Sequence, residues 1–249
     1  MINSKKLLYI FGATLTLMVS LVSPVTASAV GSASVKEAQT IMTKFGIPAG
    51  PIDGLDGSQT RRGLCIFRYM SKLSVNRNSL EGTTLSTLRS FNTKYSSLGK
   101  IPAVSSSSNL EKLVVNETCQ AMTYSTKSSD GKHYYKKVMA VSTGITGHGT
   151  PNGTYPLNGT QRGWSCSTLY PESCRKQTTG RFVYIGDYGN MYNFRSFIGN
   201  TYGIHGSTSV PTYPASHGCV RVTVTDSDWM YDNVGNGGNR PELQVTGSY

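Results

Sequence analysis

Apolar positions between residues 35 and 95 recur at the three- and four-residue spacing of amphipathic helices. The clearest case is Val35–Phe45, which is followed by the helix-ending residues Gly46 and Pro48. Similar patterns predict helices over Arg61–Leu73 and near Thr84–Tyr95. Three short helices of this kind predict a small helical bundle.

After Leu110 the pattern changes to short β-prone segments separated by turn dipeptides such as Asp130-Gly131. We therefore predict a mainly-β domain, sandwich or barrel-like, and an α+β protein of two domains. A short helix around Trp229 is expected to cover the sheet, with Trp229 packed against it. The expected strands are Lys112–Val115, Ala121–Tyr124, Tyr134–Ser142, Arg181–Ile185, Tyr202–His205, Val220–Val224 and Glu242–Val245.

The first thirty residues are typical of a secretory signal. Lys5 and Lys6 precede an apolar run over residues 7–22, and Ala27-Ser28-Ala29 then offers a cleavage site. An uncleaved membrane anchor is the alternative, but the run is shorter than the roughly 20 residues that span a bilayer. We predict a signal at 1–29, a helical domain at 30–100, a Ser-rich linker at 101–109 and a β domain at 110–249. No second long apolar run follows, so a protein integral to the membrane is not predicted.

The fraction of charged residues and the net charge of the chain limit the kinds of molecule that it is expected to bind. Charged residues make up only 15% of the chain, against about 25% in average domains, which suits a turn-rich β protein and excludes a long coiled coil. The net charge is +11, which favours an anionic partner, although charge of this kind also serves solubility alone. No zinc-finger spacing or RNA-binding motif is found, so nucleic acid is not predicted. Acidic cell-wall polymers or membrane surfaces fit better.

The chain has five cysteines, an odd number. Disulfides persist in exported proteins, and five cysteines leave one thiol free or bonded between chains. Cys166 and Cys174 flank a short loop and are the expected local pair, and Cys65 with Cys119 would then join the two halves of the chain. Cys219 is left over. Other pairings of four cysteines remain open at this stage.

The residues that point to chemistry lie in Ile204–Ser207 and Ser216–Arg221. A thiol becomes a strong nucleophile when a base takes its proton. His205 ends a separate expected strand that can lie beside Cys219, whereas His217 is two residues away on the same segment and need not reach the sulfur. The following Arg221 can bind a carboxylate on the same face.

Less specific interpretations compete with this one. Cys219 could be a structural disulfide cysteine and each histidine a turn residue. A zinc site would recruit His205, His217 and Cys219 with His148 or His133, but it lacks the close paired spacing of such sites. Tyr192 and Asn193 either line the cleft or pack. The signatures of serine hydrolases, nucleotide-binding loops and zinc proteases are absent.

The string Ser-His-Gly-Cys-Val-Arg at 216–221, with the upstream His-Gly at 205–206, resembles L,D-transpeptidases of the YkuD type. These are secreted cysteine enzymes that cross-link peptidoglycan. Val141–Gly144 and Thr150–Tyr155 are similar to an earlier strand and loop of that domain, so the resemblance covers about Leu110–Tyr249. A sortase is a more distant alternative, because its cysteine normally follows a Thr-Leu-x-Thr motif.

The resemblance implies roles for individual residues. Cys219 would be the nucleophile, His205 its base, and the carbonyl of Gly206 would orient the imidazole. The enzyme would attack the bond between the third residue of a tetrapeptide stem and its terminal D-alanine, form a thioester, and pass the acyl group to an amine of a second stem. No metal or organic cofactor is implied. The expected oxyanion and substrate-binding residues are Ser207, Ser216, His217, Gly218 and Arg221.

The helical half also carries a resemblance. Val35–Phe45, followed by Gly50–Gly54 and Thr60–Arg62, is similar to three-helix peptidoglycan-binding modules. Asp53, Gly54 and Thr60 are the corresponding wall-binding candidates, and a purely structural helical lid is the alternative. The expected partners are therefore the stem peptides and glycan of a bacterial cell wall.

Two other functions remain open from the sequence. One is L,D-carboxypeptidase activity, in which water replaces the acceptor amine on the same scaffold. The other is a non-catalytic wall-binding protein. The sequence does not specify an oligomeric state.

Overall fold

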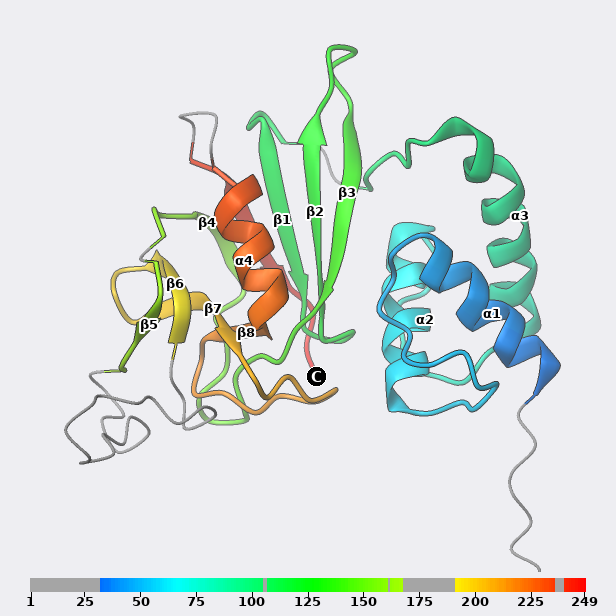
Figure 1. The fold of residues 1–249 in the computed structure, drawn as a ribbon, viewed down its shortest axis with the longest axis horizontal. Helices are drawn as coiled ribbons and strands as arrows, with labels where there is room; N and C mark the ends of the chain where they lie inside the picture. Colours follow the sequence, from blue (N-terminus) through cyan, green and yellow to red (C-terminus); the bar gives the residue numbers. More distant parts are fainter. Residues whose placement is uncertain (1–31, 105–106, 161, 168–190, 236–239) are drawn as a thin grey trace, which may run out of the picture.

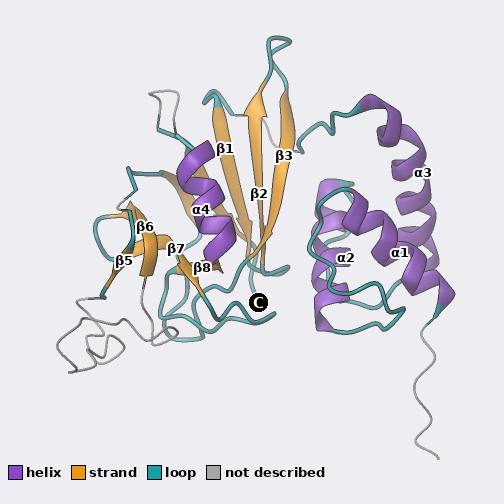
Figure 2. Cartoon of the chain, viewed as in Figure 1, coloured by secondary structure: helices purple, strands orange, loops and turns teal. Residues whose placement is uncertain are grey.

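The computed structural model describes residues 32–104, 107–160, 162–167, 191–235 and 240–249. Three helices come first, and two β-sheets with one further helix follow (Figures 1 and 2). This is the predicted α+β organisation with a helical part and a β-rich part. The expected signal at 1–29 lies outside the described residues.

The helical part consists of α1 (Ala33–Lys44), α2 (Ser58–Met70) and α3 (Gly82–Leu98), so the three predicted helices are confirmed. The second lies slightly nearer the N-terminus than expected. Lys72 has a φ of 59°, and the N–H of Leu73 turns back to the carbonyl of Arg68 at 2.8 Å, which ends the helix early.

The second helix, α2, provides most of the core of the bundle. Leu64, Ile66 and Phe67 have no exposed surface, because α2 packs against the other helices on one side and faces the sheets on the other (Figure 1). Phe91 of α3 meets Phe67 edge to face, with ring centroids 5.3 Å apart. α2 is therefore covered on nearly all sides, and its buried residues include Arg62 and Arg68 as well as apolar ones.

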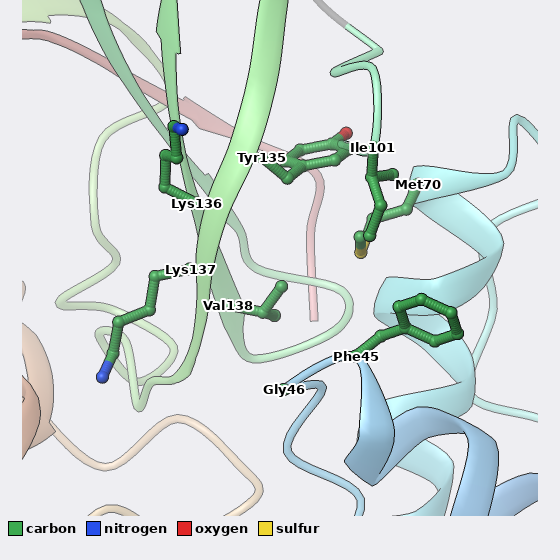
Figure 3. A pocket seen from close by; sticks show the side chains of 8 residues that line it. All are labelled: Phe45, Gly46, Met70, Ile101, Tyr135, Lys136, Lys137 and Val138. Atoms are coloured by element: carbon green, nitrogen blue, oxygen red, sulfur yellow. The ribbon is translucent and has the colours of Figure 1, made fainter. Parts of the chain in front are cut away.

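The two parts share a core. Ala121 and Val138 of the β domain belong to the same buried cluster as the helices. The start of the expected linker pairs with the edge of the strand at His133–Ala140. The N–H of Ala103 donates to the carbonyl of His133 at 2.8 Å, and the carbonyl of Ile101 accepts from the N–H of Tyr135 at 2.9 Å. A small hollow of about 190 Å³ remains at this junction (Figure 3).

The β-rich part is a sandwich of two sheets with α4 (Val224–Asn233) packed alongside (Figure 1). One sheet has the strand order β3-β2-β1-β9-β4 and the other β5-β6-β7-β8. The pairs β1/β9 and β7/β8 are parallel and the rest antiparallel. Apolar side chains of both sheets and of α4 meet in one core. The strands are β1 (Glu111–Asn116), β2 (Ala121–Lys127), β3 (His133–Ala140), β4 (Gly153–Pro156), β5 (Trp164–Ser165), β6 (Met191–Ile198), β7 (Tyr202–Ser207), β8 (Val220–Thr223) and β9 (Glu242–Thr246).

Three strands were not predicted. The strand β4 begins with Gly153 and ends with Pro156, which are typical of turns and not of strands. The strand β5 has only two residues, too few to show alternation. In β6 the pairing register shifts between Tyr192 and Arg195, and Asn193 has a φ of 49°. This bulge disrupts the period-two pattern on which the prediction depends. The strand expected at 181–185 lies outside the described residues.

The last predicted strand boundary was also wrong. Val224 starts α4 instead of ending β8, because Thr223 caps the helix. The Thr223 hydroxyl accepts a hydrogen bond from the N–H of Asp226 at 3.0 Å, which satisfies one of the free donors of the first turn. The predicted helix around Trp229 is confirmed, and its ring packs edge-on against Tyr124 at 5.5 Å.

Candidate active site

Strands β7 and β8 bring the two sequence motifs together. They pair in parallel, with Ile204 opposite Val220 and His205 opposite Arg221. Cys219 immediately precedes β8 and therefore lies beside Gly203. Since alternate residues of a strand share a face, Cys219, Arg221 and His205 lie on one face of this sheet. The expected placement of His205 beside the cysteine segment is confirmed.

The imidazole of His205 is buried and oriented. His205 is only 4% exposed. Its Nδ1 atom lies 3.0 Å from the carbonyl oxygen of Gly206. A carbonyl only accepts, so Nδ1 carries the proton and Nε2 keeps its lone pair. Burial lowers the pKa of His205 to about 4, and the nearby positive charge of Arg221 adds to this effect.

The thiol of Cys219 is free. It lies 3.7 Å from the carbonyl oxygen of Thr201. Burial raises its pKa, whereas the N–H of Gly203 and the charge of Arg221 act in the opposite direction. The thiol of Cys219 and the imidazole of His205 are therefore both neutral near pH 7.

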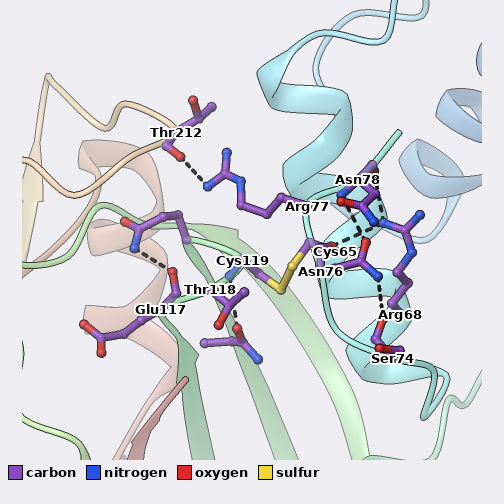
Figure 4. The surroundings of a disulfide bond; sticks show 12 residues. Cys65, Arg68, Ser74, Asn76, Arg77, Asn78, Glu117, Thr118, Cys119 and Thr212 are labelled. Atoms are coloured by element: carbon purple, nitrogen blue, oxygen red, sulfur yellow. Dashed lines mark hydrogen bonds between the residues drawn. A yellow bond between two sulfur atoms is a disulfide. The ribbon is translucent and has the colours of Figure 1, made fainter. Parts of the chain in front are cut away.

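The other cysteines that the structure describes form disulfides, as expected. Cys65 and Cys119 form a disulfide that joins α2 to the turn after β1 (Figure 4). Cys166 is also disulfide-bonded, while Cys174 lies outside the described residues, so its pairing stays a prediction. Cys219 is thus kept out of the intrachain bonds.

The turn before Cys219 is held by its own side chains. The Ser216 hydroxyl donates to the carbonyl of Cys219 and accepts from the N–H of Gly218 at 3.1 Å. Gly218 has a φ of 116°, and an added Cβ would lie 2.5 Å from the ring of Tyr202. Only glycine fits this position without strain. The Gly218 amide, expected in the oxyanion hole, here serves the turn.

The other predicted site residues lie around this turn. The ring of His217 lies tilted against that of His148, with centroids 5.0 Å apart. Ser207 is hydrogen-bonded to Ser209 in the following turn. Arg221 exchanges two backbone hydrogen bonds with Ser142. Val141–Gly144 therefore lies beside the cysteine segment.

Two supporting residues had not been predicted. Thr150 donates to the carbonyl of Gly218 at 2.9 Å and accepts from the N–H of Gly144. Its place in the Thr-Pro-Asn-Gly motif is a signal that could have identified it. The side-chain amide of Gln120 makes two hydrogen bonds to Thr143. Its oxygen accepts from the N–H of Thr143 at 2.9 Å, and its nitrogen donates to the Thr143 hydroxyl at 2.7 Å. Nothing in the sequence marks Gln120.

The zinc alternative finds no support in the geometry. His133 lies on β3, where its ring is close to Ser125 and Ser107. Within the described ranges no group of three or more His, Cys, Asp or Glu side chains is placed to hold a metal ion. The same ranges contain no helix that is both long and apolar enough to cross a membrane.

The wall-binding candidates of the helical domain form a network around buried Gln39. Its amide donates to Asp53 and Thr60, both at 3.0 Å, and accepts from the N–H of Gly54 at 2.7 Å. These bonds give all three a structural role in the turn before α2. Binding of glycan at this turn stays a prediction.

The helical domain also reaches the segment between the two motifs. Arg62 donates to the carbonyls of Val210 and Pro211, and Arg77 donates to the carbonyl of Thr212 at 2.6 Å (Figure 4). The two arginines thereby connect the bundle to the chain that runs from His205 to Ser216.

A free thiol beside an oriented imidazole on neighbouring strands defines a candidate cysteine acyl-transfer site. Residues 111–242 match the family model of the YkuD L,D-transpeptidase catalytic domain. Because this match covers more than half of the chain, the protein belongs to the YkuD L,D-transpeptidase family.

A solved structure agrees at the level of the fold. The chain is similar to an L,D-transpeptidase from Xylanimonas cellulosilytica, with a TM-score of 0.54 and 22% identity, over 87% of this chain and 94% of that one. A second, from Stackebrandtia nassauensis, has a TM-score of 0.46 and 19% identity, over 88% and 93%. No curated protein sequence matches the chain. The first likeness extends beyond residues 111–242, so it includes part of the helical domain.

Proposed function

We propose that this protein is a secreted peptidoglycan L,D-transpeptidase with Cys219 as nucleophile and His205 as general base. The observation that carries the proposal is the parallel register of β7 on β8. It puts a free thiol and an oriented imidazole on one sheet face in a chain of the YkuD family. Secretion is supported by the signal pattern at 1–29.

In the first half-reaction the thiol attacks the carbonyl carbon of the third stem residue. The thiol proton passes to Nε2 of His205, while Gly206 stabilises the imidazolium through Nδ1. The tetrahedral oxyanion is bound by the amide of Cys219 and by the charge of Arg221, since the amide of Gly218 is bonded to Ser216. His205 then protonates the leaving nitrogen, the C–N bond breaks, and D-alanine departs from the thioester.

In the second half-reaction an amine of another stem attacks the thioester. His205 takes a proton from this amine and returns it to the sulfur as the C–S bond breaks. One amide is therefore exchanged for another, with D-alanine as the co-product. Water in place of the amine would give the carboxypeptidase reaction, because the acylation step is the same.

The test is incubation of the purified protein with disaccharide-tetrapeptide. We expect a covalent adduct by intact-protein mass, free D-alanine and a cross-linked dimer. Cys219→Ala should abolish all three, and His205→Ala should slow adduct formation by about 10²- to 10⁴-fold. His133→Ala, which alters a buried histidine on β3, is the matched control and should retain activity.

Product masses separate the alternatives. A cleaved tripeptide without dimer would identify the hydrolase. Adduct formation by Cys219→Ala, or unchanged D-alanine release from it, would refute the catalytic assignment.

A further inference from the structure

Gln120 is a fully buried glutamine in an unusual backbone conformation. It follows the disulfide-bonded Cys119 in the turn after β1 (Figure 4). The residue has no exposed surface, and its φ of 51° lies in the left-handed region that glycine and asparagine adopt more readily. A residue in such a conformation is fixed by its surroundings, and such positions cluster at functional sites. The hydrogen bonds of its side chain show what this conformation holds in place.

The side-chain amide of Gln120 is held in a single orientation. Nε2 donates to the carbonyl of Glu117 at 2.8 Å and to the hydroxyl of Thr143 at 2.7 Å. Oε1 accepts from the N–H of Thr143 at 2.9 Å. A carbonyl only accepts and an N–H only donates, so exchanging the amide oxygen and nitrogen would break the bonds to both of these backbone groups. Both N–H groups of the amide are used, and two of the three bonds go to Thr143.

Thr143 in turn holds the segment before Cys219. Its carbonyl accepts from the N–H groups of Ala215 and Ser216, both at 3.0 Å. The hydroxyl of Ser216 then donates to the carbonyl of Cys219. A chain of direct hydrogen bonds therefore runs from Gln120 to the backbone of the proposed nucleophile.

The neighbours of Thr143 bond to the cysteine segment at both of its ends. Ser142 exchanges two backbone hydrogen bonds with Arg221, and the N–H of Ile145 donates to the carbonyl of Ser216 at 2.9 Å. Thr143 lies between these two contacts, and its own N–H and hydroxyl are the groups that the glutamine holds. A shift of Thr143 would therefore move the whole segment that carries the thiol.

We propose that Gln120 is a positioning residue for the acyl transfer, because it fixes Thr143 and, through Thr143, the turn that carries Cys219. The inference rests on the proposed function, since the reaction that is positioned is the one assigned there. Gln120 acts through its hydrogen-bond partners and takes no part in the chemical steps. It sets the place of the thiol relative to His205, where a displacement of about 1 Å can cost roughly 10²-fold in rate.

Kinetics of D-alanine release test the proposal. Gln120→Met keeps nearly the same volume and removes all three side-chain hydrogen bonds. We expect kcat to fall by about 10- to 100-fold with little change in KM, because the thiol moves while the substrate contacts stay. Tyr124→Phe is the matched control. It removes a hydrogen bond from another buried side chain, the one that the Tyr124 hydroxyl donates to the carbonyl of Asn233, and it should retain kcat.

A double-mutant cycle tests whether the effect passes through Thr143. Thr143→Val keeps the shape of the side chain but removes the hydroxyl that accepts from Gln120. We expect it to lower kcat on its own and to have little further effect in Gln120→Met, because residues that act as one unit are not additive. Thr143→Ser keeps the hydroxyl and should restore most of the loss. Fully additive losses would contradict transmission through Thr143. The comparison of Thr143→Val with Thr143→Ser also carries the test where Gln120→Met does not fold.

Hydrogen exchange measures how firmly the turn is held without any reaction. Mass spectrometry follows the amides of residues 215–219, two of which are bonded to the carbonyl of Thr143. Gln120→Met should speed their exchange by at least about 10-fold and leave the amides of β9 unchanged, since global unfolding would speed both.

The two measurements separate the two proposals. Unchanged kcat in folded Gln120→Met would overturn the positioning role, whatever its hydrogen exchange shows. Absence of D-alanine release from the unaltered protein would refute the proposed function. Hydrogen exchange needs no activity, so unchanged exchange at 215–219 in Gln120→Met would refute the hold of Gln120 on the turn in either case.

Discussion

At the scale of single residues, the site depends on two groups that are both neutral before substrate arrives. Burial lowers the pKa of His205 to about 4 and raises that of Cys219. At pH 7 the imidazole is therefore unprotonated, and the thiol keeps its proton. A thiolate–imidazolium pair would require the opposite shifts, a lowered thiol pKa and a raised imidazole pKa.

This predicts the pH profile of thiol alkylation in the absence of substrate. The rate of reaction of Cys219 with iodoacetamide should climb steadily from pH 6 to beyond pH 9, because the thiolate fraction grows throughout that range. Stopped samples analysed by mass spectrometry give the rate at each pH. A plateau between pH 5 and pH 8 would indicate a preformed ion pair and contradict the description. Denatured protein provides the reference curve of an unperturbed thiol.

At the scale of elements, the two motifs are joined by a segment that both domains hold. The hydroxyl of Ser142 donates to the carbonyl of Tyr213 at 2.7 Å from within the β domain. Arg62 and Arg77 donate to the same segment from the helical domain. Arg62 is buried, and burial lowers its pKa to about 10, so it remains charged at neutral pH. We infer that the bundle positions the segment between His205 and Cys219.

Arg62→Ala should therefore slow D-alanine release, by about 10- to 100-fold, because small displacements of reacting groups are costly. The effect should fall on kcat more than on KM, and iodoacetamide labelling of Cys219 should change little. Arg61→Ala is the matched control, since Arg61 is an exposed neighbour whose ion pair with Asp56 is at the surface. Full activity in a folded Arg62→Ala protein would show that the bundle does not position the site.

At the scale of the whole molecule, the helical and β-rich parts behave as one packed body. Ala121 and Val138 extend the bundle's core into the sheet, and the segment at 101–103 continues the edge of β3. The disulfide between Cys65 and Cys119 closes 54 residues of chain across this junction. Such a cross-link stabilises mainly by restricting the unfolded chain.

Replacing Cys65 and Cys119 together with alanine should lower the free energy of unfolding by roughly 2–4 kcal/mol. Urea denaturation followed by circular dichroism measures the loss as a lower midpoint. Cys219→Ala should serve as the background, so that no thiol remains to exchange with other disulfides. An unchanged midpoint would mean that the shared core alone holds the two parts together.

Features that depend on residues close together in the sequence could be predicted from the sequence alone. Helical spacing at Val35–Phe45 predicted α1, and the motif at 216–221 predicted the cysteine turn. The strand β6 was missed because its bulge at Asn193 breaks the alternation. Gln120 was missed because a buried polar residue in a turn has no periodic signature.

The sequence by itself determined the α+β organisation, the family and the two motifs, because each follows from residues that are neighbours along the chain. The tertiary structure alone decided that His205 and Cys219 lie on one face of the sheet and which arginines reach the segment between them. These depend on strand register and on packing between distant segments, where contacts are made by residues with no relation in sequence spacing.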